Sequence, residues 1–99
     1  MRKLRVTSTP PLLTVSGMIY DSVRREVVVF GGGTRSGYTD DTWTWNGTNW
    51  FLKTPSTRPG PRGAHSMFFD LARGKAVLFG GDAPTASLAD TWLWDGTNW

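Results

Sequence analysis

The side chains of this sequence that could do chemistry are few, and they do not form a recognisable catalytic set. The chain has one histidine, His65, and no cysteine. The missing cysteines exclude disulfides, thiolate metal sites and a thiol nucleophile. His65 has no serine or aspartate partner at a spacing known from catalytic triads, so a hydrogen-bonded structural histidine is the alternative to a binding role. We therefore expect no catalytic residue, no bound metal, no cofactor and no enzymatic activity.

Three further side chains with recognition chemistry lie in loops between apolar segments. They are Arg35, Tyr38 and Arg58. Together with His65 they form the candidate binding residues of this sequence. The alternative is that they belong to ordinary solvated loops, since polar loops are common on protein surfaces.

Two other motifs have a structural interpretation that competes with a functional one. Asp41 and Asp90 resemble a carboxylate pair, but each follows a loop, where a carboxylate can accept hydrogen bonds from backbone N–H groups. The double glycines at 31–32 and 80–81 could belong to a phosphate-binding loop, but neither is followed by the lysine and helix that such a loop needs. We expect the carboxylates to bind backbone and the glycines to end strands.

The charge of the chain gives little indication of a partner. There are 11 Lys and Arg against 8 Asp and Glu, a net charge of +3. Five of the basic residues gather near the N-terminus and around position 24, whereas the others are spread along the chain, so we expect no nucleic acid partner. The longest apolar run, Val27–Phe30, is far too short to span a bilayer, and no targeting segment is evident, so the compartment stays unknown.

The whole chain is organised by a repeat of 49 residues. When residues 16–50 are laid on residues 65–99, 15 of the 35 positions are identical and no gap is needed. All six tryptophans fall into three matched pairs. We therefore divide the chain into repeat one, residues 2–50, and repeat two, residues 51–99. Two whole repeats and one methionine make up the length, as expected of an excised or duplicated fragment.

The local pattern within each repeat predicts β-strands and no helix. Apolar runs of strand length are bounded by turn residues, and Asn46-Gly47 and Asp95-Gly96 are typical of tight hairpins. If repeat one turns as repeat two does at Gly74, Arg25 must take a strained positive φ. The predicted strands are 17–21, 26–30, 42–45 and 50–53 in repeat one and 64–70, 75–79 and 91–94 in repeat two, with loops at 33–40 and 82–89.

These residues resemble the kelch repeat, which is the four-stranded blade of kelch-type β-propellers, including galactose oxidase-like proteins. An apolar quartet runs into a double glycine and is followed by Asp-Thr-Trp and by a further tryptophan seven residues on. The signature positions are Gly31, Gly32, Trp43, Trp45, Trp50, Gly80, Gly81, Trp92, Trp94 and Trp99. Repeat two also has the kelch lead-in at 61–66, whereas repeat one departs from it at 12–16. The copper site of the oxidases needs a modified cysteine, which this chain lacks.

The resemblance implies an all-β propeller with two four-stranded blades per chain, the tryptophans filling the space between blades. Propellers close with about 4 to 8 blades, so we expect copies of the chain to complete the ring. A homotrimer would give six blades, and a homotetramer with eight is the runner-up. This self-assembling fragment would have a structural or protein-interaction role. The alternatives are a module that binds a protein, peptide or glycan on its loop face, and a piece of an enzyme whose catalytic residues lie elsewhere.

One strand is expected to be exchanged between copies. Repeat two ends at Trp99, before the strand that follows Trp50 in repeat one, while residues 2–6 align with residues 51–55 and have no tryptophan before them. An unpaired strand edge is a template for another chain. The pattern therefore predicts that residues 2–6 of one copy pair with residues 91–94 of the next.

Overall fold

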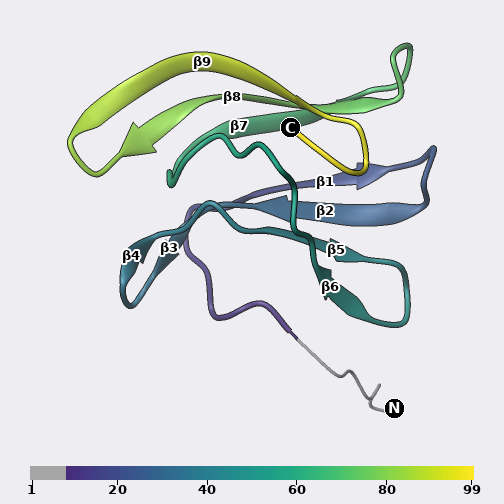
Figure 1. Ribbon diagram of the computed structural model, residues 1–99, viewed down its shortest axis with the longest axis horizontal. Helices are drawn as coiled ribbons and strands as arrows, with labels where there is room; N and C mark the ends of the chain where they lie inside the picture. The colour runs from purple at the N-terminus through teal and green to yellow at the C-terminus, as the bar shows by residue number, and fades with distance from the viewer. Residues whose placement is uncertain (1–8) are drawn as a thin grey trace.

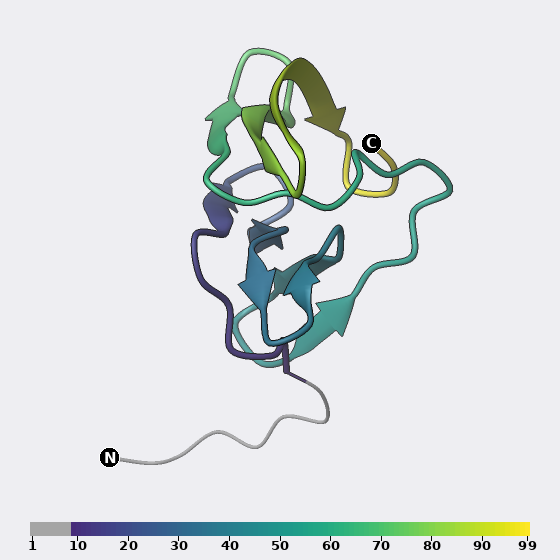
Figure 2. The same ribbon diagram turned by 90° about the vertical axis from the view of Figure 1, so that its left-hand side faces the viewer.

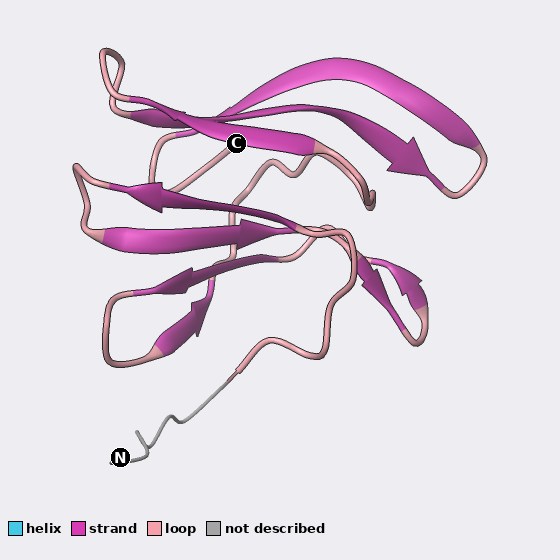
Figure 3. Cartoon of the chain, turned by 180° about the vertical axis from the view of Figure 1, so that it is seen from behind, coloured by secondary structure: helices cyan, strands magenta, loops and turns pink. Residues whose placement is uncertain are grey.

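A computed structural model of the chain describes residues 9–99. This part of the chain is all-β, and none of its residues is in a helix (Figure 3). The all-β prediction is therefore confirmed. The strand predicted at residues 2–6 lies outside the described residues.

Repeat one forms a four-stranded antiparallel sheet in the order β1-β2-β5-β6. The continuous apolar run of β2 lies second in this order, with β1 and β5 on either side of it. Its strands are β1 (Gly17–Asp21), β2 (Glu26–Phe30), β5 (Thr42–Trp45) and β6 (Trp50–Leu52), and a short hairpin of β3 (Gly33–Thr34) and β4 (Gly37–Tyr38) is inserted between β2 and β5. These strands lie where the sequence predicts them, and β3 and β4 give structure to a segment expected to be a loop.

Repeat two forms a three-stranded antiparallel sheet in the order β7-β8-β9. Its strands are β7 (Ser66–Asp70), β8 (Lys75–Ala83) and β9 (Ala86–Trp94). The loop predicted at 82–89 is wrong, because β8 and β9 continue to pair there as a long hairpin. The double glycine at 80–81 does not end the strand but shifts its register, as a β-bulge does. Strand β7 begins two residues later than expected, since Ala64 takes a positive φ of 55°.

The two sheets lie one above the other, with β1 of the first against β7 of the second (Figures 1 and 2). The β1–β2 and β7–β8 turns lie at one end of this pair of layers, and the β3–β4 and β8–β9 hairpin tips lie at the other (Figure 1). Equivalent turns and hairpin tips of the two repeats therefore lie at the same end of the pair of sheets.

The first turn of each repeat is built in the same way. Asp21 accepts hydrogen bonds from the backbone N–H groups of Val23 and Arg24 at 3.0 and 2.9 Å. Arg25 then takes a φ of 58°, close to the 66° of Gly74 in the equivalent position. The strained arginine expected from the sequence is therefore confirmed.

Candidate assembly and binding surfaces

The two sheets pack through one face of each, which we call the inner faces. Antiparallel partners point their side chains to the same side, and alternate residues of a strand share a face. The inner face of the first sheet carries Gly17, Ile19, Val28, Phe30, Thr42 and Thr44. The inner face of the second carries Met67, Phe69, Ala76, Leu78, Trp92 and Trp94. Val28, Ala76 and Trp94 form the buried centre of this packing, so the core lies between the sheets.

The last tryptophan of repeat two attaches its end to the first sheet. The ring centroid of Trp99 lies 5.0 Å from that of Phe30, in an edge-to-face arrangement, and 5.3 Å from that of Trp94. The Trp99 indole N–H donates a hydrogen bond of 2.9 Å to the Thr42 hydroxyl. Phe30 is fully buried as a result of this packing. These tryptophans therefore fill space between the sheets in the single chain.

The two outer faces repeat the two surfaces that pack in the interior. The outer face of the first sheet carries Met18, Tyr20, Val27, Val29, Trp43 and Trp45, which are the repeat-one equivalents of the second sheet's inner face. The outer face of the second sheet carries Ser66, Phe68, Val77, Phe79, Thr91 and Leu93, the equivalents of the first sheet's inner face. The two outer faces are therefore related to each other by sequence as the two packed inner faces are.

Exposure differs sharply at several equivalent positions of the inner and outer faces, although Val29, Trp43 and Val77 of the outer faces are buried. Phe30 is 0% exposed, whereas its equivalent Phe79 is 50% exposed. Thr44 is 1% exposed, and its equivalent Leu93 is 40% exposed. On the first sheet, the outer residues Met18 and Tyr20 are exposed as well (68% and 56%), although their equivalents lie against the core. Both outer faces thus present apolar side chains of a kind that the chain buries elsewhere.

The outer edge of β9 is open. In the first sheet β6 covers the edge of β5 through the pairs Trp43–Leu52 and Trp45–Trp50. Within residues 9–99, no strand pairs with the equivalent edge of β9. This is the edge on which the sequence predicts an exchanged strand.

A buried arginine cluster in repeat two escaped the sequence analysis. Arg62 is 2% exposed, and its guanidinium binds both carboxylate oxygens of Asp90 at 2.6 and 2.9 Å. It also donates to the carbonyl oxygens of Gly80 (3.0 Å) and Pro59. The Trp92 indole N–H donates to the same carboxylate at 2.8 Å. The Arg62 guanidinium, followed by the Trp92 hydrogen bond, holds the pKa of Asp90 at about 2 against the opposing effect of desolvation.

Repeat one lacks this cluster. Leu13 stands at the position equivalent to Arg62, and Asp41, equivalent to Asp90, lies 3.5 Å from Arg58 instead. The indole N–H of Trp43, the equivalent of Trp92, is buried and finds no hydrogen-bond partner in the described part of the chain. The expectation that Asp41 and Asp90 would chiefly accept backbone N–H groups is therefore corrected, since their side-chain partners are arginines. An arginine present in only one of two repeats, beside an aspartate present in both, was the signal available in the sequence.

His65 lies between the sheets rather than on the loop surface. Its side chain is buried, with Nε2 2.9 Å from the Gly17 backbone nitrogen and 2.8 Å from the Phe30 carbonyl oxygen. Its Nδ1 is buried and has no hydrogen-bond partner among residues 9–99. Desolvation by burial, aided by the positive charge of Arg62, lowers the pKa of His65 against the effect of the Phe30 carbonyl. The imidazole is therefore neutral at pH 7.

This burial predicts a loss of stability in mild acid. Because the folded-state pKa of His65 lies below the unfolded value of about 6.5, the stabilisation is complete above pH 6.5 and is lost as pH falls from there toward the folded pKa. We expect the free energy of unfolding to fall by up to about 1.4 kcal/mol per pH unit in this window. Urea titrations at several pH values measure the slope. His65→Asn should remove the slope between pH 6.5 and 5, and the interpretation is wrong if the slope survives in that variant.

The other candidate binding residues are dispersed. Arg35 lies exposed at the β3–β4 turn, while the Tyr38 ring packs closely against Gly63. Arg58 pairs with Asp40 at 3.2 Å and, more distantly, with Asp41. Only Arg35 lines a groove of about 640 Å³, whose other residues are Pro11, Leu12, Thr14, Gly33, Thr34 and Ser36. The structure therefore does not bring Arg35, Tyr38, Arg58 and His65 together into one site.

The double glycines allow backbone conformations with positive φ. Gly31 and Gly80 have φ values of 67° and 66°, and Gly32 and Gly81 have 103° and 102°, values that only glycine adopts readily. A Cβ at Gly31 would lie 2.9 Å from the Arg62 carbonyl oxygen, and the Gly32 N–H donates to that oxygen at 2.8 Å. At Gly31 and Gly32 the chain therefore approaches Arg62 of the other repeat closely.

Several other kinds of site are not found in the described part of the chain. No group of three or more histidine, aspartate or glutamate side chains is placed to hold a metal ion within residues 9–99. The same residues contain no helix of the length and apolar character needed to cross a membrane. A scan against protein-family models and a search of curated proteins both find no match to this chain.

Proposed function

We propose that this chain is a self-assembling β-propeller unit, in which each repeat is a kelch-type blade and several copies close one ring. Its role is structural or in protein interaction, and it performs no catalysis of its own. One observation supports this above the others. Each outer face carries the residue pattern of the surface that already packs in the interior, so an interface between copies can repeat an interface that exists within the chain.

The number of copies follows from the propeller proposal. Rings of whole two-blade chains have an even number of blades, and a homotrimer with six is favoured over a homotetramer with eight. The contact is heterologous, because the outer face of the second sheet meets the outer face of the first sheet of the next copy. The exposed phenylalanines, Phe68 and Phe79, would then be covered by the Met18 and Tyr20 side of the neighbour.

The solution mass tests this proposal directly. Size exclusion with light scattering should give three times the chain mass of 11.0 kDa, or about 33 kDa, at micromolar concentration. A mass of about 44 kDa would support the eight-bladed ring. A folded monomer of 11.0 kDa at all concentrations would contradict self-assembly.

A second candidate function is a binding module for a protein, peptide or glycan. The groove between residues 11–14 and the β3–β4 hairpin supports it, because its lining is largely apolar and includes the exposed guanidinium of Arg35. Mostly apolar concave surfaces with a few polar groups are typical of ligand sites. Peptide and glycan arrays probed with the chain and with Arg35→Ala would decide whether this groove binds either class.

A further inference from the structure

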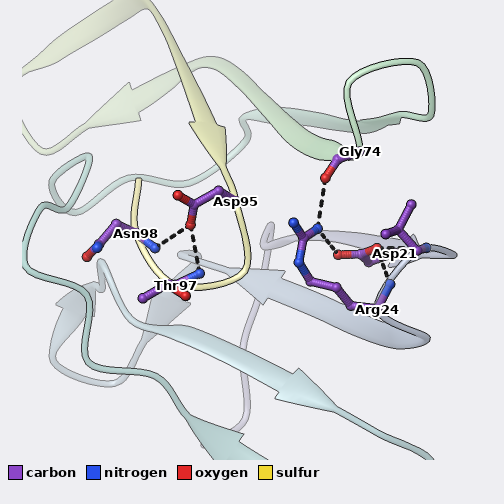
Figure 4. A network of polar contacts seen from close by, with 7 residues as sticks. Asp21, Arg24, Gly74, Asp95, Thr97 and Asn98 are labelled. Atoms are coloured by element: carbon purple, nitrogen blue, oxygen red, sulfur yellow. Dashed lines mark hydrogen bonds and ion pairs between the residues drawn. The ribbon is translucent and has the colours of Figure 1, made fainter.

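Arg24 of repeat one links the two sheets at the end where the β1–β2 and β7–β8 turns lie (Figure 4). Asp21 is fully buried and holds Arg24 by an ion pair of 2.8 Å. From this position Arg24 donates a second hydrogen bond of 2.8 Å to the carbonyl oxygen of Gly74 in the other repeat. Its side chain also rests on the turn after β9, where a Cβ at Gly96 would collide with it. Its charge contributes to lowering the pKa of Asp95, after the backbone N–H groups of Asn98 and Thr97.

Repeat two has an equivalent arginine, Arg73, whose side chain extends into solvent, and we call this side chain the arm. Arg73 pairs with Asp70 at 2.7 Å, and the Arg73 backbone N–H donates to the same carboxylate at 3.2 Å. The hydrogen bonds from Arg73 lower the pKa of Asp70. The Arg73 side chain is 70% exposed, against 31% for Arg24. The Arg73 side chain is therefore already oriented by Asp70. Within residues 9–99, no carbonyl oxygen outside its own turn accepts a hydrogen bond from it.

We call the Gly74 carbonyl oxygen and the Gly96 turn, which receive Arg24, the socket. Repeat one has an equivalent socket at Arg25 and Gly47, and no side chain of residues 9–99 lies on the Gly47 turn as Arg24 does on Gly96. Arg25 occupies the position of Gly74 and has nearly the same φ, so the two turns are similar at this point. Gly47 has the φ of 99° found at Gly96, but a Cβ added there would meet nothing within 4 Å in the described part of the chain. Asn46 accepts hydrogen bonds from Thr48 and Asn49 just as Asp95 accepts them from Thr97 and Asn98.

The charged side chains around the socket differ between the two repeats. In repeat two the positive charge of Lys75 lies close enough to Asp95 to contribute to its pKa. The equivalent of Lys75 in repeat one is Glu26, and the equivalent of Asp95 is the neutral Asn46. The guanidinium of Arg25, which stands where repeat two has Gly74, balances Glu26, so the formal charge of these positions is zero in both repeats.

We propose that Arg73 of one copy enters the socket of a second copy, donating to the carbonyl oxygen of Arg25 and lying on the Gly47 turn. This inference rests on the proposed self-assembly and names a polar contact within it. The apolar outer faces supply the attraction between copies, and the arm fixes how they are aligned, because its hydrogen bond requires one register of one sheet against the other.

The test is a double-mutant cycle on the assembly of the full chain, followed by light scattering over a dilution series. Arg73→Ala should raise the midpoint concentration of assembly about tenfold, as expected for a hydrogen bond to a charged donor. Asn46→Asp copies the turn of repeat two and should lower the midpoint about two- to threefold by adding an exposed charge pair. In the double variant this gain should disappear, since the cation that the introduced carboxylate would meet is gone.

Arg35→Ala is the matched control, because it removes an equal and exposed charge at the opposite end of the sheets. If Arg73→Ala changes the midpoint no more than Arg35→Ala does, or if Asn46→Asp keeps its effect without Arg73, the arm does not occupy the socket. In either case the wild-type assembly itself remains visible, and only the polar contact fails. A wild-type chain that never assembles would instead overturn the proposed function and this contact together.

Discussion

Replacing Phe79 by aspartate is expected to leave the chain as a folded 11.0 kDa monomer. Phe79 is 50% exposed in the single chain, and its repeat-one equivalent, Phe30, is fully buried by Trp99. In the proposed ring Phe79 would be buried in the same way by the neighbouring copy. Removing the aromatic ring and burying a carboxylate in its place should cost about 4 kcal/mol or more per interface. Such a loss weakens association about a thousandfold, and light scattering measures it directly.

A matched control separates loss of the interface from a general effect of the substitution. Phe51 is 46% exposed and shares the face of Thr44, which the second sheet already packs against in the single chain. Phe51→Asp should therefore leave the mass of the assembly unchanged. If Phe79→Asp assembles like the wild-type chain, the outer face of the second sheet is not the interface, whatever the oligomer may be.

Replacing Arg62 by leucine should destabilise the fold itself. Leucine is the residue that repeat one has at this position, so the substitution is tolerated sterically by an equivalent backbone segment. In repeat two it removes the guanidinium donor from the Gly80 and Pro59 carbonyl oxygens and leaves the Asp90 carboxylate with the Trp92 indole N–H alone among its side-chain donors. Because Asp90 is partly exposed and regains some hydration, we expect a loss of about 2–4 kcal/mol in the free energy of unfolding.

Two measurements identify the cause of that loss. The pKa of Asp90, which is about 2 in the folded chain, should rise toward the ordinary aspartate value when Arg62 is absent. The exposed variant Arg35→Leu makes the same chemical change and should alter the unfolding free energy by less than about 0.5 kcal/mol. An unchanged melting temperature for Arg62→Leu would show that the buried guanidinium is not important for stability.

The strands and their turns could be predicted because their determinants are local. The apolar run of β2 and the Asn-Gly and Asp-Gly hairpins each depend on residues close together in sequence. The 49-residue repeat then assigns the same elements to both halves of the chain. Even the strained φ of Arg25 followed from aligning it with Gly74. The double glycine at 80–81 was misread because a positive φ permits either a strand end or a bulge, and pairing across the β8–β9 hairpin selects the bulge.

The contacts of the candidate site depend on tertiary structure and could not be read from spacing. The partners of His65 could not be read from its position at the start of a strand, because Gly17 and Phe30 are 48 and 35 residues away. The Arg62–Asp90 pair spans 28 residues and occurs in one repeat only, so the repeat pattern that revealed the strands concealed it. The difference between the inner and outer faces likewise appears only once the two sheets are packed.

In the proposed assembly, the connection between the sheets, residues 53–65, would make the contact within one chain much stronger than the equivalent contact between chains. Within one chain this short connection holds the second sheet near the first at an effective concentration of about millimolar. Between chains, the equivalent surfaces meet only at the actual protein concentration. In the proposed assembly the internal contact therefore persists on dilution while the contact between chains is lost. Dilution would release intact two-sheet units, which makes the linked pair of sheets, rather than the single repeat, the unit of exchange between rings.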